Sequence, residues 1–332
     1  MATNPFCKDI KSVDFNNESH LCRILEQDKH TRIEGLCSEA VFMEDIIEGN
    51  FSSVASDFWY TRVEKKYHVY KVITDPSVPL NDLDYQILDG FDSSIKHQRD
   101  LKTSSVSIVY FDESSKTFRK FIHIYGNRYS NIYGLGSDMS PVCNAESAEQ
   151  SQRDPVRLKK ACDFLKQRGL LKDAAIKRLF ANCWLQDKGV WDIDAFTKTA
   201  GGKVVAFEVK QKFPIDHKSY GVNKGQADML SYLIKNGIRV MHIILRKPVD
   251  DKEIHGVDLL TEPKYVERTQ WEYARFRPEM LSDALSDAPP PTSISGKSHM
   301  AYYRIGVKHF KILKKFRVAT GDVRNKLLRE IE

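Results

Sequence analysis

The stretch KVVAFEVKQKFP, residues 203–214, constrains the fold most, because it reads as a buried strand that ends in charged side chains. Successive side chains of a strand point to opposite faces. Three apolar residues share one face here, whereas Glu208 and Lys210 follow two apolar residues on the other. Apolar residues on both faces are typical of a central strand in an α/β sheet. A solvated Glu–Lys pair at a strand end stabilises little, so the surrounding sequence must decide whether this pair marks a site.

The segment around this strand alternates between helical and strand patterns. In chain order it predicts a helical stretch over 154–189 with an interruption near Gly169, a strand over 190–196, a Gly-Gly turn, the strand over 203–210, a helix over 223–237 and a buried strand over 238–248. This α–β–β–α–β order predicts an α/β core with a mixed sheet flanked by helices. Asp192 and Asp194 are expected on one face of the first strand.

The N-terminal half predicts an additional α+β domain with an antiparallel sheet. Two short helical patterns come first, and then SIVYFD and TFRKFIHIY alternate around the polar turn ESSK, as in a hairpin. No internal repeat is visible. The predicted organisation is an accessory domain over 1–130, a linker over 131–153, a core over 154–286, a Pro/Ser linker over 287–296 and a basic C-terminal segment over 297–332.

Composition excludes several classes of protein. Apolar residues make up 41% of the chain, but no apolar run reaches the roughly 20 residues of a membrane helix. The N-terminal sequence lacks the apolar core of a signal peptide, so we expect a cytoplasmic protein that does not bind a membrane. The six cysteines have no close pair, which favours packed, reduced thiols over disulfides or a zinc site.

Several charged groups are expected to meet at the end of the buried strand. The hairpin is short enough to bring Asp194 beside Glu208 and Lys210. Clustered carboxylates repel one another, and burying them without compensation is costly. A divalent cation relieves both problems, and Mg²⁺ takes oxygen ligands, usually one or two carboxylates with waters and phosphate oxygens.

Asp194, followed fourteen residues later by Glu208-x-Lys210, resembles the PD-(D/E)xK phosphodiesterase superfamily. That superfamily includes restriction endonucleases, Holliday-junction resolvases and repair exonucleases. The resemblance covers residues about 155–247 and implies a restriction-endonuclease-like core. Gln226, at the start of the helix after the second strand, matches a position where many members have Gln.

The chain departs from the superfamily pattern in three places. No Pro precedes Asp194, and the Gln-x-x-x-Tyr of exonuclease-type members is absent because the next Tyr lies six residues after Gln226. Many members carry a Glu on the first core helix, but the predicted core has none before Glu208. Asp163 or Asp173 substitutes for it, or the position is empty.

The resemblance implies a metal-dependent nuclease. Its catalytic residues would be Asp194, Glu208, Lys210 and Gln226. Asp194 and Glu208 would hold Mg²⁺ or Mn²⁺, which orients the scissile phosphate and activates water. Asp192 is either a third metal ligand or an acid at the strand edge. Lys210 would stabilise the developing anion.

Two groups of lysines are candidates for contacts with nucleic-acid phosphates. Lys212, Lys218 and Lys224 follow the motif, and their alternative is a solvated loop. The second group lies in the segment 297–332, which has ten Lys or Arg against three acids and interleaved aromatic residues. Its candidates are Lys311, Lys314 and Lys315. The alternative for this segment is a helix packed on its own domain with a basic outer face.

The leading hypothesis is a Mg²⁺-dependent DNA endonuclease that acts on double-stranded DNA, in restriction and defence or on a mobile element. A nuclease for RNA or for branched recombination DNA is the second hypothesis. A catalytically idle nucleic-acid-binding module is the third. Cleavage of both strands by one site per chain favours a homodimer.

Overall fold

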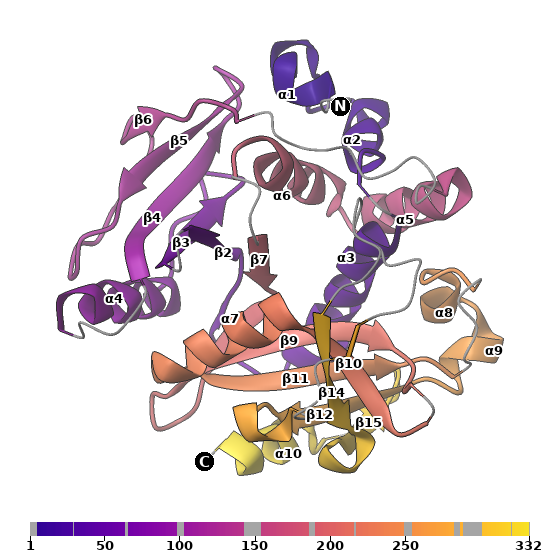
Figure 1. Cartoon of the computed structure of the whole chain (residues 1–332). Coiled ribbons are helices and arrows are strands. Elements are labelled where there is room, and N and C mark those ends of the chain that lie inside the picture. The colour runs from indigo at the N-terminus through magenta and orange to yellow at the C-terminus, as the bar shows by residue number, and fades with distance from the viewer. Residues whose placement is uncertain are drawn as a thin grey trace. The chain divides into compact units, whose positions relative to one another are not determined.

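The computed structural model divides into two compact units (Figure 1). Unit 1 comprises Met1–Asp28 and Ala55–Ile193, and unit 2 comprises Lys29–Val54 and Asp194–Glu332. The structure describes residues 5–28, 30–63, 66–97, 103–142, 154–185, 190–215, 217–248, 254–281, 286–287, 301–319 and 321–331.

This division corrects the predicted domain boundaries. Residues 154–193, which were predicted to begin the core, belong to unit 1, and residues 29–54 belong to unit 2. Most of unit 1 is thus an insertion into unit 2. Apolar packing explains the assignment of residues 29–54, since the ring of Phe42 lies 5.5 Å and that of Phe51 5.8 Å from the ring of Phe207 in the buried strand.

Unit 1 is a six-stranded sheet with helices. Its helices are α1 (Pro5–Lys8), η1 (Ile10–Ser12), α2 (Glu18–Leu25), α4 (Asp82–His97), α5 (Pro155–Gln167) and α6 (Leu171–Cys183). Its strands are β2 (Phe58–Val63), β3 (Lys66–Ile73), β4 (Thr103–Asp112), β5 (Thr117–Ile122), β6 (Ser137–Asp138) and β7 (Val190–Ile193). The strand order is β6-β5-β4-β3-β2-β7.

The predicted hairpin in unit 1 is confirmed, but the antiparallel sheet is wrong. Strands β4 and β5 pair antiparallel around a turn in which Asp112 accepts a hydrogen bond from the backbone N–H of Ser114 at 3.0 Å. Strands β3 and β4, however, are parallel, because α4 carries the chain back across the sheet between them. The sheet of unit 1 is therefore mixed.

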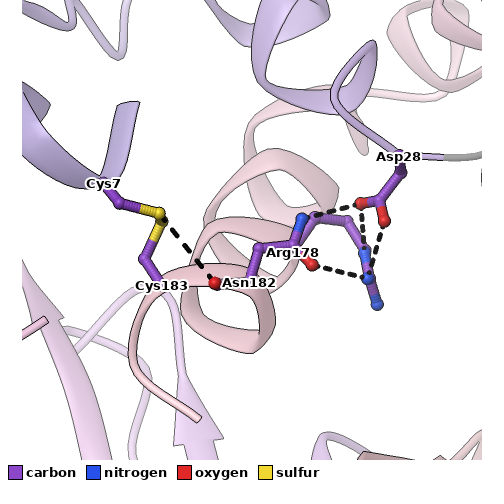
Figure 2. The surroundings of a disulfide bond; sticks show 5 residues. All are labelled: Cys7, Asp28, Arg178, Asn182 and Cys183. Atoms are coloured by element: carbon purple, nitrogen blue, oxygen red, sulfur yellow. Dashed lines mark hydrogen bonds and ion pairs between the residues drawn. A yellow bond between two sulfur atoms is a disulfide. The ribbon is translucent and has the colours of Figure 1, made fainter. Parts of the chain in front are cut away.

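A disulfide joins Cys7 of α1 to Cys183 at the end of α6, within unit 1 (Figure 2). The prediction of reduced cysteines is wrong for this pair. Next to it, Arg178 of α6 donates two hydrogen bonds to the buried Asp28, at 2.8 and 3.0 Å, and Asn182 donates a third at 3.0 Å. The N-terminal segment is thus fastened to α6 both covalently and by a buried ion pair.

Unit 2 contains a six-stranded and a three-stranded sheet. Its helices are α3 (His30–Phe42), η2 (Met43–Ile47), α7 (Lys224–Lys235), α8 (Asp258–Thr261), α9 (Pro263–Val266), η4 (Pro278–Met280), η5 (Val307–His309) and α10 (Val323–Ile331). Its strands are β1 (Val54–Ala55), β8 (Ala195–Lys198), β9 (Val204–Lys212), β10 (Ser219–Asn223), β11 (Arg239–Arg246), β12 (Gln270–Arg275), β13 (Ser286–Asp287), β14 (Ala301–Gly306) and β15 (Lys311–Lys315). The larger sheet has the order β1-β8-β9-β11-β12-β15, and the smaller one β10-β14-β13.

The predicted centre of the core is confirmed in unit 2. Strand β9 pairs antiparallel with β8 and parallel with β11, and α7 makes the crossover between β9 and β11. Val205, Ala206 and Phe207 of β9 are fully buried, as expected of a strand that is covered on both faces. Unit 2 is therefore a mixed α/β structure with helices packed on its sheet.

The basic C-terminal segment is not separate from the core. Strand β14 pairs with β10, and β15 forms the edge of the larger sheet beside β12. The predicted Pro/Ser linker at 287–296 lies outside the described residues except for Asp287. In the part of the chain that the structure describes, none of the helices has the length and apolar character needed to span a membrane.

Candidate active site

The strand predicted over 190–196 is interrupted at Asp194. Strand β7 ends at Ile193 and pairs with β2 in unit 1, whereas β8 begins at Ala195 and pairs with β9 in unit 2. Asp192 lies opposite Trp59 in the sheet of unit 1. The two acids therefore do not share one strand face, because the two halves of the segment belong to different sheets. Asp194 stands at the junction, at the start of unit 2.

Asp194 and Glu208 are brought together by the hairpin of β8 and β9. The side chain of Asp194 accepts a hydrogen bond from the backbone N–H of Val209 at 2.5 Å. This contact places its carboxylate beside the strand position that carries Glu208. Glu208 itself is only 2% exposed and lies opposite His242 on the parallel strand β11. The hairpin therefore places Asp194 opposite the strand position of Glu208.

Helix α7 holds Glu208 from the other side. Asn223 caps the helix, since its side chain accepts a hydrogen bond from the backbone N–H of Gln226 at 2.7 Å. The side-chain amide of Gln226, which is buried, donates a hydrogen bond to Oε1 of Glu208. The predicted proximity of Gln226 to the motif is therefore confirmed, and its direct partner is the Glu208 carboxylate.

Lys210 completes the motif at the exit of β9. Its Nζ lies 2.5 Å from Oε1 of Glu208, and its side chain is 31% exposed. Burial acts to lower the pKa of Lys210. The carboxylates of Glu208 first, and then of Asp194 and Glu39, outweigh burial and raise this pKa above its ordinary value. Lys210 is therefore a fixed cation that reaches the surface among carboxylates.

Glu39 is a member of the cluster that sequence reasoning missed. It lies on α3, and one of its carboxylate oxygens is within 4.8 Å of one from Asp194. Helix α3 is anchored in unit 2, because Oε1 of Glu34 accepts a hydrogen bond from the backbone N–H of Gly256 at 2.7 Å. A Cβ at Gly256 would come within 2.9 Å of Glu34 atoms, so only glycine fits there. The only sequence signal for Glu39 is the helical pattern around it, in the segment of unit 2 that comes before the inserted part of unit 1.

The acids suggested from the sequence for this helix position lie elsewhere. Asp163 is on α5 and pairs with Lys159 at 2.7 Å, and Asp173 is on α6, 2.5 Å from Lys177. Both helices belong to unit 1. Neither acid substitutes for the first-helix carboxylate, because the helix that packs on β9 is α3.

The donor set of unit 2 fits a divalent cation. Mg²⁺–oxygen bonds are about 2.0–2.1 Å long, so two ligands of one ion lie up to about 4.2 Å apart. Glu39 and Asp194 need only a small adjustment from their spacing of at most 4.8 Å. These two residues would hold such an ion. Glu208, the other ligand that the sequence predicts, stays a prediction. Asp192, which was left open as a third ligand, stays a prediction.

The predicted phosphate-binding lysines have different surroundings. Lys314 is buried and pairs with Asp45 at 2.6 Å, so it supports the fold and is not available for a phosphate.

Two of the other predicted lysines form ion pairs. Lys311 pairs with Glu330, and Lys224 with Asp228 at 3.2 Å. Lys218 and Lys315 are exposed, and with Lys311 and Lys224 they stay candidates.

Lys212 is more enclosed than a solvated loop residue. Its ammonium donates a hydrogen bond to the carbonyl oxygen of Gly221 in β10. Burial, and next the positive charge of Lys210, lower the pKa of Lys212 to about 8. The ammonium of Lys212 therefore loses its proton at a lower pH than that of an exposed lysine.

Comparisons with family models, curated proteins and solved structures find no significant match to this chain. The functional argument consequently depends on the geometry of the site.

Proposed function

We propose that this chain is a Mg²⁺-dependent nuclease that hydrolyses phosphodiester bonds within DNA. One observation carries the proposal, namely the meeting of Asp194, Glu208 and Lys210 at one end of β9, with Glu39 beside them. Carboxylates around a space for one cation, with a fixed ammonium at the exit, suit a reaction that builds negative charge on a phosphate. The order of these residues is that of the PD-(D/E)xK superfamily.

Each side chain has a distinct role in this proposal. The ammonium of Lys210 stabilises the negative charge that grows on the phosphate oxygens. Gln226 fixes the rotamer of Glu208, and the N–H of Val209 fixes Asp194, so that both carboxylates are oriented before substrate arrives. A cation bound by Glu39, Asp194 and Glu208 would supply Lewis-acid chemistry and lower the pKa of a water ligand.

The proposal is tested by incubating the full chain with supercoiled plasmid in Mg²⁺, in Mn²⁺ and in EDTA. We expect nicking or linearisation that requires metal. The variant Glu208→Gln keeps the side-chain size, and Lys210→Gln replaces the ammonium by a neutral amide. Each should lower the rate by about 10²-fold or more, as removal of one preorganised electrostatic group does in other enzymes. Lys264→Gln is the matched control, because Lys264 is an exposed lysine on α9.

The other hypotheses make different predictions in this assay. Cleavage of RNA or of four-way DNA junctions, with plasmid left intact, would change the proposed substrate. The assignment of the active-site residues would stay the same. No cleavage of any substrate, together with metal-independent binding that survives Glu208→Gln, would contradict the nuclease and favour an idle binding module.

A further inference from the structure

A cavity of about 370 Å³ lies in unit 2 where two parallel strands end. Its lining includes Phe213 and Pro214, which directly follow β9, and Arg246, the last residue of β11. The two strand ends are joined by a hydrogen bond from the backbone N–H of Lys247 to the carbonyl oxygen of Lys212 at 2.8 Å. The carboxyl ends of parallel strands are a common place for ligands in α/β sheets.

The lining of this cavity is strongly basic. Three of its eight residues, Arg246, Lys247 and Arg268, are cations at neutral pH, and no acid is among the described residues that line it. Like charges brought together around a concave space repel one another, and an anion relieves that repulsion. The cavity therefore favours an anionic ligand.

A buried network orients one of these cations. Glu272 of β12 is only 5% exposed and accepts hydrogen bonds from Arg246 at 2.9 Å, from Gln270 at 2.7 Å and from Tyr220 at 2.7 Å. The Arg246 side chain is nevertheless 41% exposed. A guanidinium has five N–H donors in a planar fork, so it can bind an oxyanion as well as its carboxylate partner. Arg246 is thus held in place at the cavity wall.

We propose that this cavity binds a phosphate group of the nucleic-acid substrate, away from the bond that is cut. The identity of the ligand rests on the proposed function, whereas its anionic class rests on the lining. Phe213 follows Lys210 by three residues, so the cavity begins about 10 Å further along the strand direction. Two arginines and a lysine match the charge and the oxygen geometry of phosphate. The phosphate belongs either to the interior of a strand or to its 5′ end.

The test measures binding without cleavage. Fluorescence anisotropy in EDTA follows the full chain on a short double-stranded DNA oligonucleotide that carries either a 5′-phosphate or a 5′-hydroxyl. Arg268→Gln and Lys247→Gln should each weaken the Kd by about tenfold, as expected for loss of a charge-assisted hydrogen bond, and should flatten its salt dependence. Arg324→Gln is the control, because Arg324 is exposed on α10 and does not line the cavity. Circular dichroism confirms that each variant is folded.

Each outcome supports or overturns the inference. Equal weakening on both oligonucleotides supports an internal phosphodiester, and weakening on the 5′-phosphate alone supports a strand end. Variants that bind both oligonucleotides as tightly as the intact chain overturn it, as does an intact chain that binds neither. A chain that binds through these residues but never cuts would disprove only the nuclease. A chain that cuts while the variants bind normally would disprove only the phosphate site.

Discussion

The two units share one strand topology, although the sequence shows no repeat. In unit 1 the hairpin β2–β3 leads through α4 to the parallel strand β4 and then to the antiparallel strand β5. In unit 2 the hairpin β8–β9 leads through α7 to β11 and then to β12 in the same order. A short strand lies beside each hairpin. It is β7, after α6, in unit 1 and β1, after α3 and η2, in unit 2.

The corresponding positions carry different chemistry. In unit 2, the strand residue that contacts the first turn of the crossover helix is Glu208, hydrogen-bonded to Gln226. In unit 1 it is Lys71, paired with Asp84 at 2.8 Å. Two residues further along the strand, unit 1 has the apolar Ile73 where unit 2 has Lys210.

The difference extends across the hairpin. In unit 1, Phe58 lies opposite Lys71. In unit 2, Ala195 pairs with Phe207, so Asp194, the residue before Ala195, lies opposite Glu208. At the strand positions that correspond to Asp194 and Glu208, unit 1 thus has Phe58 and Lys71, neither of which is an acid. The comparison teaches that this topology is a scaffold, and that the choice of a few side chains at the end of one strand decides whether it can bind a cation.

The largest predicted effect on the cleavage rate comes from a comparison of two acids, one on a helix of each unit. Glu39→Gln on α3 should lower metal-dependent cleavage by about 10²-fold, because one carboxylate of the cation site is neutralised. Asp173→Asn on α6, the acid that the sequence suggested for this role, should leave the rate within about twofold, since Asp173 pairs with Lys177 in unit 1 and is not a member of the acid cluster. Plasmid cleavage rates at saturating Mg²⁺ measure both. Equal losses in the two variants would contradict the assignment of α3 to the site.

A second prediction concerns the ion pair that replaces the acid cluster in unit 1. Lys71 and Asp84 are both nearly buried, and Lys71 also donates a hydrogen bond to the carbonyl oxygen of Ser56 at 2.7 Å. Lys71→Met should destabilise unit 1 by about 3 kcal/mol, because it leaves the charge of Asp84 buried without its partner. Urea unfolding measures the loss.

The double variant Lys71→Met/Asp84→Asn is the control for that experiment. It removes both charges, so it should recover much of the lost free energy of unfolding. Cleavage by the folded variants should be unchanged. A large loss of cleavage in a folded Lys71→Met chain would show that unit 1 takes part in the chemistry and would break the contrast between the units.

Local patterns in the sequence predicted the centre of the site well. Strand β9, helix α7 and strand β11 follow from hydrophobic periodicity, and the short turn before β9 was enough to bring Asp194 to Glu208. These features depend on residues close together in the chain, where period and turn length determine geometry. The position of Gln226 follows in the same way, because it lies in the first turn of α7.

Long-range features could not be predicted. Most of unit 1 separates Glu39 from the motif in the chain, and hydrophobic patterns do not specify which helix packs on which strand. The same limit applies to the disulfide of Cys7 and Cys183, which are 176 residues apart. The break at Asp194 was hidden because 190–196 reads as one continuous strand, although its halves pair in different sheets.

The smallest predicted effect concerns the last residue of β9. Lys212 has a pKa of about 8 in the folded chain, against an ordinary value of 10.5, because of burial and the charge of Lys210. Between these two values the unfolded chain binds more protons than the folded chain at this position. The free energy of unfolding should therefore rise with pH above about 8, by roughly 1 kcal/mol after allowance for solvent screening. Below pH 8 the charged form is present in both states and the gain is absent.

The variant Lys212→Met isolates this contribution. Other groups also titrate in this range, and Glu208, Lys210 and His242 interact electrostatically with Lys212 or its neighbours. The relevant quantity is therefore the difference between the intact chain and the variant, measured by urea unfolding in EDTA from pH 7 to 9.5. We expect the intact chain to gain stability relative to the variant as pH rises. In unit 1, Asp75 follows Ile73 as Lys212 follows Lys210, but its pKa is lowered mainly by hydrogen bonds from Ser77. Asp75→Asn should therefore leave this alkaline gain intact, and a matching loss there would mean that the gain does not arise at the end of β9.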